Sequence, residues 1–346
     1  MTKNLLLKIV KRLDRSLSGQ ANNFSEQFMY GHREILIAYS GVEANWAIKG
    51  SIAHGWSPLD PNFGVPKLFG KRFIHLAWSS RVLHGFNYKY AGNVVPIGAP
   101  FLYLCKLFDE LKVAKLSTSR DFLFIPAHGT ELSSPKVESL IANYQTMYDP
   151  NKTTVQLYWT EFLEKRIRDA YLSKGFDVVT AGFSGLSSRE GLGISTRERA
   201  MSTIGGRHLF LLRVLINLHS HSEVIFSHFG TSTLYAGYLK KRIHLLNSDK
   251  NFTYTVLNND TKIISGHDAE NDFVQREIFV KYFNNDGVAQ PNFEEFCAME
   301  LGFNDLLTSS DLAKLISTNY FLLKSDSPVT ELLQQLKLSA KDQNVP

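Results

Sequence analysis

The sequence predicts an α/β protein whose second half is a doubly wound parallel sheet. Three observations support this fold class. From residue 121 onwards, short apolar segments alternate with helical segments, which is the order of βαβ units with right-handed crossovers. The 346 residues exceed the usual size of one domain, so two domains are expected. Apolar residues make up 44% and charged residues 21% of the chain, as in ordinary globular proteins.

The first half is less regular than the second. Short apolar runs are predicted to be strands at 34–39, 72–78 and 93–97, with turn-rich segments between them. We therefore expect an N-terminal domain at 1–115 that begins with a basic amphipathic helix at 1–20.

The second domain is expected at 116–346, and its elements follow in regular order. The predicted strands lie at 121–126, 153–159, 176–180, 223–227 and 242–246. The predicted helices lie at 134–148, 161–174, 207–219 and 231–240. Residues 268–340 show helical patterns with little strand. They are expected to cover this domain, and a return of the last helix to the first domain is the alternative for its end.

The net charge of +5 is concentrated at the N-terminus, where five cations and one acid leave +4 over residues 1–20. Apolar residues recur there at helical spacing, at Leu6, Ile9, Val10, Leu13 and Leu17. Such a helix either lies in an anionic membrane interface or packs on its own domain as a solvated first helix. The rest of the chain is nearly neutral, so no nucleic-acid partner is expected.

Simple counts exclude several other classes. Cys105 and Cys297 are too few for a disulfide scaffold and are expected in the core, in a reducing compartment. No apolar run approaches the ~18 residues of a spanning helix, and residues 1–20 lack the cleavage pattern of a secretory signal. No Cys/His set has structural-zinc spacing, so no metal is expected. We therefore expect a soluble, cytoplasmic protein.

Ligands of doubly wound sheets bind beyond the carboxyl ends of the strands, so residues that follow the predicted strands are the candidates. Three predicted strands are followed by glycines or by residues with a hydroxyl or imidazole group. These residues are His128, Gly129 and Thr130 after the first strand, Gly182 after the third, and Gly230, Thr231 and Ser232 after the fourth. Glycine lets a backbone approach a ligand closely. A helix that begins with Thr231 would offer its N–H groups and positive dipole end to a phosphate. The set predicts a nucleotide cradle, while ordinary helix capping is the alternative for Gly230–Ser232.

Arg207 is expected to begin the long helix, where its forked guanidinium would reach a phosphate. An exposed helix-start arginine is the alternative. The preceding Gly/Ser-rich segment at 184–201 is typical of a loop that closes over a ligand or of a disordered segment. No Walker motif, GxGxxG after a strand, HExxH or GxSxG occurs. Hydride transfer, kinase-like phosphoryl transfer and serine hydrolysis are therefore disfavoured.

In the N-terminal half, His54 precedes Gly55 in a turn flanked by Trp56 and a proline. The pKa of a histidine lies near neutrality, which suits removal of a proton from an acceptor hydroxyl. The alternative is a structural turn histidine bonded to backbone. His75 and His84 are weaker candidates, and His75 is expected to be packed within a strand.

The order of these motifs resembles bacterial surface-polysaccharide biosynthesis proteins of the two-Rossmann (GT-B) glycosyltransferase class. The resemblance spans roughly residues 50–245. Four segments carry it: His-Gly-Trp-Ser-Pro from His54, Ile-Gly-Ala-Pro-Phe from Ile97, Phe-Ile-Pro-Ala-His-Gly-Thr from Phe124, and Gly-Thr-Ser from Gly230 with Tyr235-Ala236.

The same order is distantly similar to the CDP-glycerol glycerophosphotransferases of teichoic acid synthesis. Their motifs fall here at His54-Gly55, Gly98-Pro100, His128 and Thr231-Ser232. Two segments depart from that pattern, Trp56-Ser57-Pro58 after the His-Gly pair and Phe229-Gly230 before the hydroxyl pair. These departures favour a sugar donor over a glycerol-phosphate donor.

The resemblance implies two Rossmann-like domains that face each other across an active-site cleft, with no obligatory metal or cofactor. The sequence agrees on the metal, because no Asp-x-Asp motif occurs. It further implies a glycosyltransferase at the inner face of the plasma membrane. Its substrates would be a nucleotide-sugar donor and a glycan or lipid-linked glycan acceptor of capsule, O-antigen or lipopolysaccharide. Cytidine-using relatives favour CMP or CDP slightly over UDP or GDP.

On this basis His54 is the candidate acceptor base. The candidate substrate and nucleotide contacts are Gly55, His128, Gly129, Thr130, Gly182, Arg207, Gly230, Thr231 and Ser232. Two other classes remain open. One is a polyol-phosphate transferase or nucleotide-sugar epimerase on the same scaffold. The other is a non-catalytic partner in polysaccharide assembly.

Overall fold

The computed structural model describes residues 2–17, 29–44, 50–53, 55–56, 74–81, 94–113, 116, 120–126, 137–184, 206–246, 274 and 277–322. The contacts divide the chain into two compact units, Met1–Val113 with Met299–Pro346, and Ala114–Ala298. This division differs from the expected domains 1–115 and 116–346 at the C-terminal end, because residues 299–346 group with the N-terminal unit. Two domains facing each other across a cleft stay a prediction.

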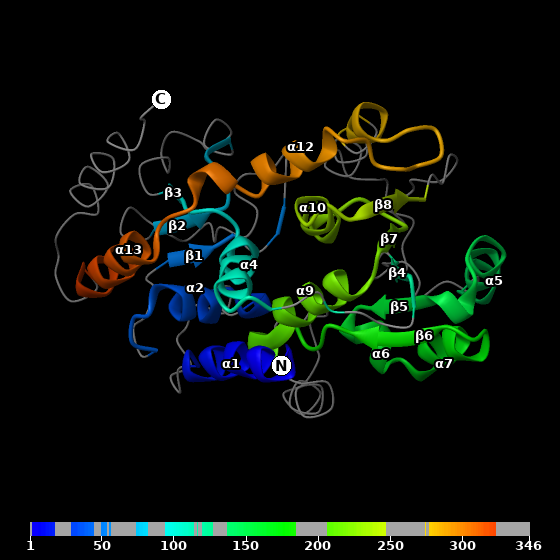
Figure 1. The fold of residues 1–346 in the computed structure, drawn as a ribbon, viewed down its shortest axis with the longest axis horizontal. Coiled ribbons are helices and arrows are strands. Elements are labelled where there is room, and N and C mark those ends of the chain that lie inside the picture. The colour runs from blue at the N-terminus through cyan, green and yellow to red at the C-terminus, as the bar shows by residue number, and fades with distance from the viewer. Residues whose placement is uncertain are drawn as a thin grey trace, which may run out of the picture. The chain divides into compact units, whose positions relative to one another are not determined.

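The C-terminal unit holds a parallel sheet with the strand order β6-β5-β4-β7-β8 (Figure 1). Its strands are β4 (Phe122–Ile125), β5 (Thr153–Leu157), β6 (Asp177–Thr180), β7 (Glu223–Phe226) and β8 (Arg242–Leu245). Ile125 lies opposite Phe226, which lies opposite Leu245, so these strands end level with one another. The α/β fold class is confirmed, and each predicted strand of this unit is present.

Helices connect these strands. They are α5 (Val137–Met147), α6 (Trp159–Leu163), α7 (Lys165–Ser173), α9 (Phe210–Ser220) and α10 (Thr231–Tyr238). Ile141 of α5 and Tyr171 of α7 join Phe124 and Val155 of the strands in one apolar cluster, so α5 and α7 cover one face of the sheet. The single helix predicted at 161–174 is wrong, because Glu164 adopts an extended backbone and separates α6 from α7.

The N-terminal unit holds a smaller parallel sheet in the order β1-β2-β3. Its strands are β1 (Gly50–Ile52), β2 (Ile74–Ala77) and β3 (Val94–Pro96). The strands predicted at 72–78 and 93–97 are thus confirmed in their central parts. The first strand was not predicted, because three residues are too few to show an alternating pattern. The helices of this unit are α1 (Thr2–Arg15), α2 (His32–Ser40), α4 (Pro100–Glu110) and α13 (Ser309–Leu322).

The strand predicted at 34–39 is wrong, because these residues belong to α2. Every residue from His32 to Ile37 is buried. A helix buried on all sides has no polar face, so its apolar run has the same appearance as a buried strand.

The N-terminal helix α1 packs on its own unit. Ile9 and Leu13 are fully buried, and α1 contacts α2. Part of the predicted apolar face therefore serves the core, while Leu7 and Leu17 stay exposed. In the part of the chain that the structure describes, no helix has the length and apolar character needed to cross a bilayer.

Candidate functional site

The candidate site of the C-terminal unit is the carboxyl edge of its sheet. All five strands described there are parallel, so the segments that follow them leave from the same edge. The chain order around β4 reverses at this sheet, since β5 lies on one side of β4 and β7 on the other. Ligands of such sheets bind at the point of reversal, which here is the end of β4 and β7.

The segment that follows β4 carries three of the predicted donor contacts, His128, Gly129 and Thr130, which lie outside the described residues. The segment that follows β7 is described. It leads through Phe229 into α10, and the Phe229 ring is buried edge-on against Phe293 at 6.0 Å.

The first turn of α10 shows which of its hydroxyls bonds to the N-cap residue. Gly230 is the N-cap residue, with extended backbone (φ −169°), and its N–H donates to the Thr233 hydroxyl at 3.1 Å. The capping hydroxyl is therefore that of Thr233, while Thr231 and Ser232 are half-buried in the first helical positions. Among the residues that the structure describes, nothing lies within 4 Å of a Cβ at Gly230, so these residues do not require glycine there.

The end of β6 has a rigid turn. Gly182 has φ +91°, a conformation that favours glycine, and its N–H donates to the Thr180 hydroxyl at 3.2 Å. Ser184 is fully buried, and its hydroxyl pairs with that of Tyr158, which follows β5, at 2.7 Å. The conformation of this turn accounts for Gly182 without a ligand.

Arg207 lies where the sequence placed it, at the start of the helical stretch. It is half-buried and opens a 3-10 turn, Arg207–Leu209, directly before α9. A crossover helix runs back antiparallel to its strands, so α9 begins near the carboxyl edge of the sheet. Arg207 and the start of α10 thus belong to the same edge.

Two polar residues of α9 were missed by the sequence reasoning. Arg213 donates to the Ala181 carbonyl at 3.2 Å, and burial lowers the pKa of its guanidinium. Asn217 donates its amide to the Gln156 side chain in β5 at 2.7 Å. Their spacing of four residues inside an otherwise apolar helix was the signal, because such residues share one helix face. They fasten α9 to the ends of β5 and β6.

In the N-terminal unit, His54 lies outside the described residues, while Gly55 and Trp56 beside it are half-buried. His75 is buried in β2, and its Nδ1 lies 2.7 Å from the Ser51 hydroxyl in β1. The prediction that His75 is packed within a strand is confirmed.

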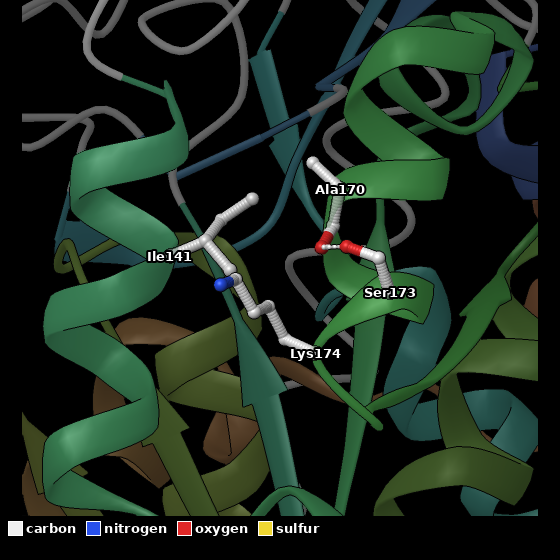
Figure 2. A pocket seen from close by; sticks show the side chains of 4 residues that line it. All are labelled: Ile141, Ala170, Ser173 and Lys174. Carbon is white, nitrogen blue, oxygen red and sulfur yellow. Dashed lines mark hydrogen bonds between the residues drawn. The ribbon is translucent and has the colours of Figure 1, made fainter.

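A small pocket lies elsewhere, between α5 and α7 (Figure 2). It is lined by Ile141, Ala170, Ser173 and Lys174. The Ser173 hydroxyl donates to the Ala170 carbonyl at 2.8 Å, so it is used within the helix. The pocket contains none of the residues predicted for the site. Within the described ranges, no group of three or more His, Cys, Asp or Glu is placed to hold a metal ion.

No family model matches the sequence, and no curated protein matches it. Among solved structures, the chain is similar to a UDP-GlcNAc 2-epimerase from Neisseria meningitidis bound to UDP-GlcNAc, with 14% identity and a TM-score of 0.31. The match covers 73% of this chain and 62% of the epimerase chain, so this chain spans less than two thirds of the epimerase. The fold class rests on the two parallel sheets of the chain itself.

Proposed function

We propose that this protein is a glycosyltransferase that moves a sugar from a nucleotide-activated donor to a glycan or lipid-linked glycan of a bacterial surface polysaccharide. The C-terminal unit binds the donor, and the N-terminal unit serves the acceptor. The observation that carries the proposal is the start of α10 at the reversal point of the sheet, beside the end of β4.

Three features favour an anionic ligand at this point. The eight-residue helix α10 directs its N-terminal dipole end toward the carboxyl edge. Thr231 and Ser232 stand in its first two positions, and the Thr233 hydroxyl accepts the N–H of the N-cap residue Gly230. Beside Gly230, no atom of the described part of the chain lies within 4 Å of a Cβ position, and a phosphate requires such space. A diphosphate at this helix start is the simplest ligand with that chemistry.

The other predicted residues complete the proposed mechanism. Arg207 supplies positive charge to the leaving nucleotide, as do the N–H groups of the α10 start, in a reaction that needs no obligatory metal. His128, Gly129 and Thr130 are proposed as further donor contacts after β4. His54 is proposed to take the proton of the acceptor hydroxyl. The enzyme is proposed to act in the cytoplasm, at the inner membrane surface.

The first test is nucleotide binding, by a thermal-shift screen with CMP, CDP, UDP and GDP. A ligand at 100 times its Kd adds about 2.7 kcal/mol of stability, which is readily measured. Stabilisation by one nucleotide, lost in the double variant Thr231→Ala/Ser232→Ala, is the expected result. No stabilisation by any of the four would overturn the donor site.

The second test is product analysis with sugars linked to the nucleotide that binds. Release of the nucleotide together with a sugar on an added glycan acceptor is expected. An epimerised donor formed without any acceptor would instead identify an epimerase. Binding without turnover for all donors would identify a non-catalytic partner.

A further inference from the structure

Residues 299–307 return to the N-terminal unit and lie on the ends of β2 and β3. The Ala99 N–H, directly after β3, donates to the Leu301 carbonyl at 2.8 Å. Gly302 has φ +72°, and a Cβ there would stand 1.8 Å from the Trp78 carbonyl, after β2. Only glycine permits so close an approach. The carboxyl ends of these two strands are therefore occupied by the chain itself.

Glu300, the last residue of α12 (Phe293–Glu300), places its carboxylate between the turns that follow β1 and β2. Its Oε2 accepts the indole N–H of Trp56 at 2.8 Å. Its Oε1 forms an ion pair with Arg81 at 2.5 Å. The Glu300 side chain is only 14% exposed, so its contact with the half-buried Trp56 is shielded from water, whereas Arg81 is 52% exposed and its ion pair lies at the surface.

Two residues that follow β1 are held by contacts from elsewhere in the N-terminal unit. The Trp78 indole N–H donates to the Ala53 carbonyl at 2.7 Å. The Trp56 indole N–H donates to Glu300, a residue 244 positions away in sequence.

We infer that Glu300 is a positioning residue, which acts through Trp56 and holds it in place after β1 for reaction with the acceptor. This inference rests on the proposed function, because His54, the proposed base, lies two residues before Trp56 in the sequence. A displacement of about 1 Å at a reacting group can cost about 10²-fold in rate. A carboxylate that holds Trp56 therefore matters to turnover without touching the substrate.

The test compares Glu300→Ala, which removes both contacts, with Glu300→Gln, which keeps an acceptor for the indole N–H. Glu294→Ala is the matched control, because Glu294 lies on the same helix and also forms an ion pair, with Lys240. We expect Glu300→Ala to lower turnover by about 10–100-fold with unchanged nucleotide affinity. Glu300→Gln should recover most of this loss, and Glu294→Ala should stay within about twofold of the wild type.

A double-mutant cycle with Trp56→Phe identifies the route. If Glu300 acts through Trp56, the double variant Glu300→Ala/Trp56→Phe turns over no more slowly than the worse single variant. Effects that multiply, or a lower melting temperature with wild-type turnover in Glu300→Ala, would overturn the inference.

The fluorescence of Trp56 provides a readout that needs no activity. It is taken as the difference between each protein and its Trp56→Phe counterpart. We expect it to change in Glu300→Ala and not in Glu294→Ala, and an unchanged signal in Glu300→Ala would overturn the contact. If His54→Gln is fully active while the Trp56 signal changes in Glu300→Ala, His54 is not the base. The contact between Glu300 and Trp56 would still be supported.

Discussion

The two parallel sheets differ at the edge where their strands end. In the N-terminal unit, residues 299–307 of the same chain lie on the ends of β2 and β3. In the C-terminal unit, β7 leads into the start of α10, where no atom of the described residues lies within 4 Å of a Cβ at Gly230. The rule that ligands bind beyond strand ends therefore identifies the edge of the sheet and not the accessible strand ends along it. The chain that covers this edge decides which strand ends remain available to a ligand.

The largest expected effect concerns the turn after β1 in the N-terminal unit. His54→Gln keeps a similar shape but cannot accept a proton at neutral pH. We expect turnover to fall by about 10²–10⁴-fold, while nucleotide affinity at the C-terminal unit stays unchanged. The pH–rate profile should lose an ascending limb near pH ~6.5. Wild-type turnover with the same profile would make His54 a structural turn residue.

Alanine substitutions at two glycines, Gly302 and Gly230, test the difference between the two sheet edges. Gly302→Ala forces a side chain into a left-handed position against the Trp78 carbonyl, so we expect a loss of about 2 kcal/mol or more in unfolding free energy. Gly230 has extended backbone, and its Cβ position meets none of the described residues, so the loss in Gly230→Ala should stay within about 0.5 kcal/mol. Urea unfolding of both variants gives the answer. Equal losses would contradict the difference between the edges.

The start of α10 offers three neighbouring hydroxyls with different expected roles. Thr231→Ala and Ser232→Ala should each weaken nucleotide binding about tenfold or more, because a hydrogen bond to a charged group contributes about 1.5–3 kcal/mol. Thr233→Ala is the control, since its hydroxyl caps Gly230, and it should lower stability by about 1 kcal/mol with little change in affinity. Calorimetric titration and thermal melts separate the two roles. Lower stability with unchanged affinity in the first two variants would make them structural.

The exposed side of α1 tests the proposed membrane contact. Deleting the helix is a poor test, because Ile9 and Leu13 belong to the core. Replacing the exposed cations Lys8, Lys11 and Arg15 by glutamine should weaken binding to anionic vesicles about fivefold per charge and leave stability unchanged. Sedimentation with vesicles measures this. Absence of vesicle binding by the wild type at low salt would refute the membrane contact.

The smallest expected effect lies at the opposite edge of the C-terminal sheet, at His221 before β7. Burial lowers the pKa of this imidazole and Lys241 lowers it further, while the hydrogen bond to the Asn217 carbonyl and the charge of Asp177 raise it. Below pH ~6.5 the unfolded chain binds a proton that the folded chain does not, so stability falls on acidification. His221→Gln should flatten this fall in urea unfolding between pH 7 and 5. An unchanged slope would assign the pH dependence to other groups.

Local sequence patterns predicted the strands of the C-terminal unit. Strand and helix periods differ, so the pattern of residues 121–246 indicated each of the five described strands, although it merged α6 and α7 into one helix. It also singled out Gly230, Thr231 and Ser232 as candidates, because strand ends in parallel sheets share one edge. These inferences were possible because each depends on neighbours in the sequence.

Other features depend on tertiary contacts. Because α2 is buried, its apolar run resembles a buried strand in the sequence. The local sequence offers three neighbouring hydroxyls at the start of α10, and the structure shows that the Thr233 hydroxyl accepts the Gly230 N–H. The contact of Glu300 with Trp56, and the place of residues 299–346 in the N-terminal unit, join residues far apart in sequence. Such contacts depend on how a sheet edge is covered, which no local period or turn signal encodes.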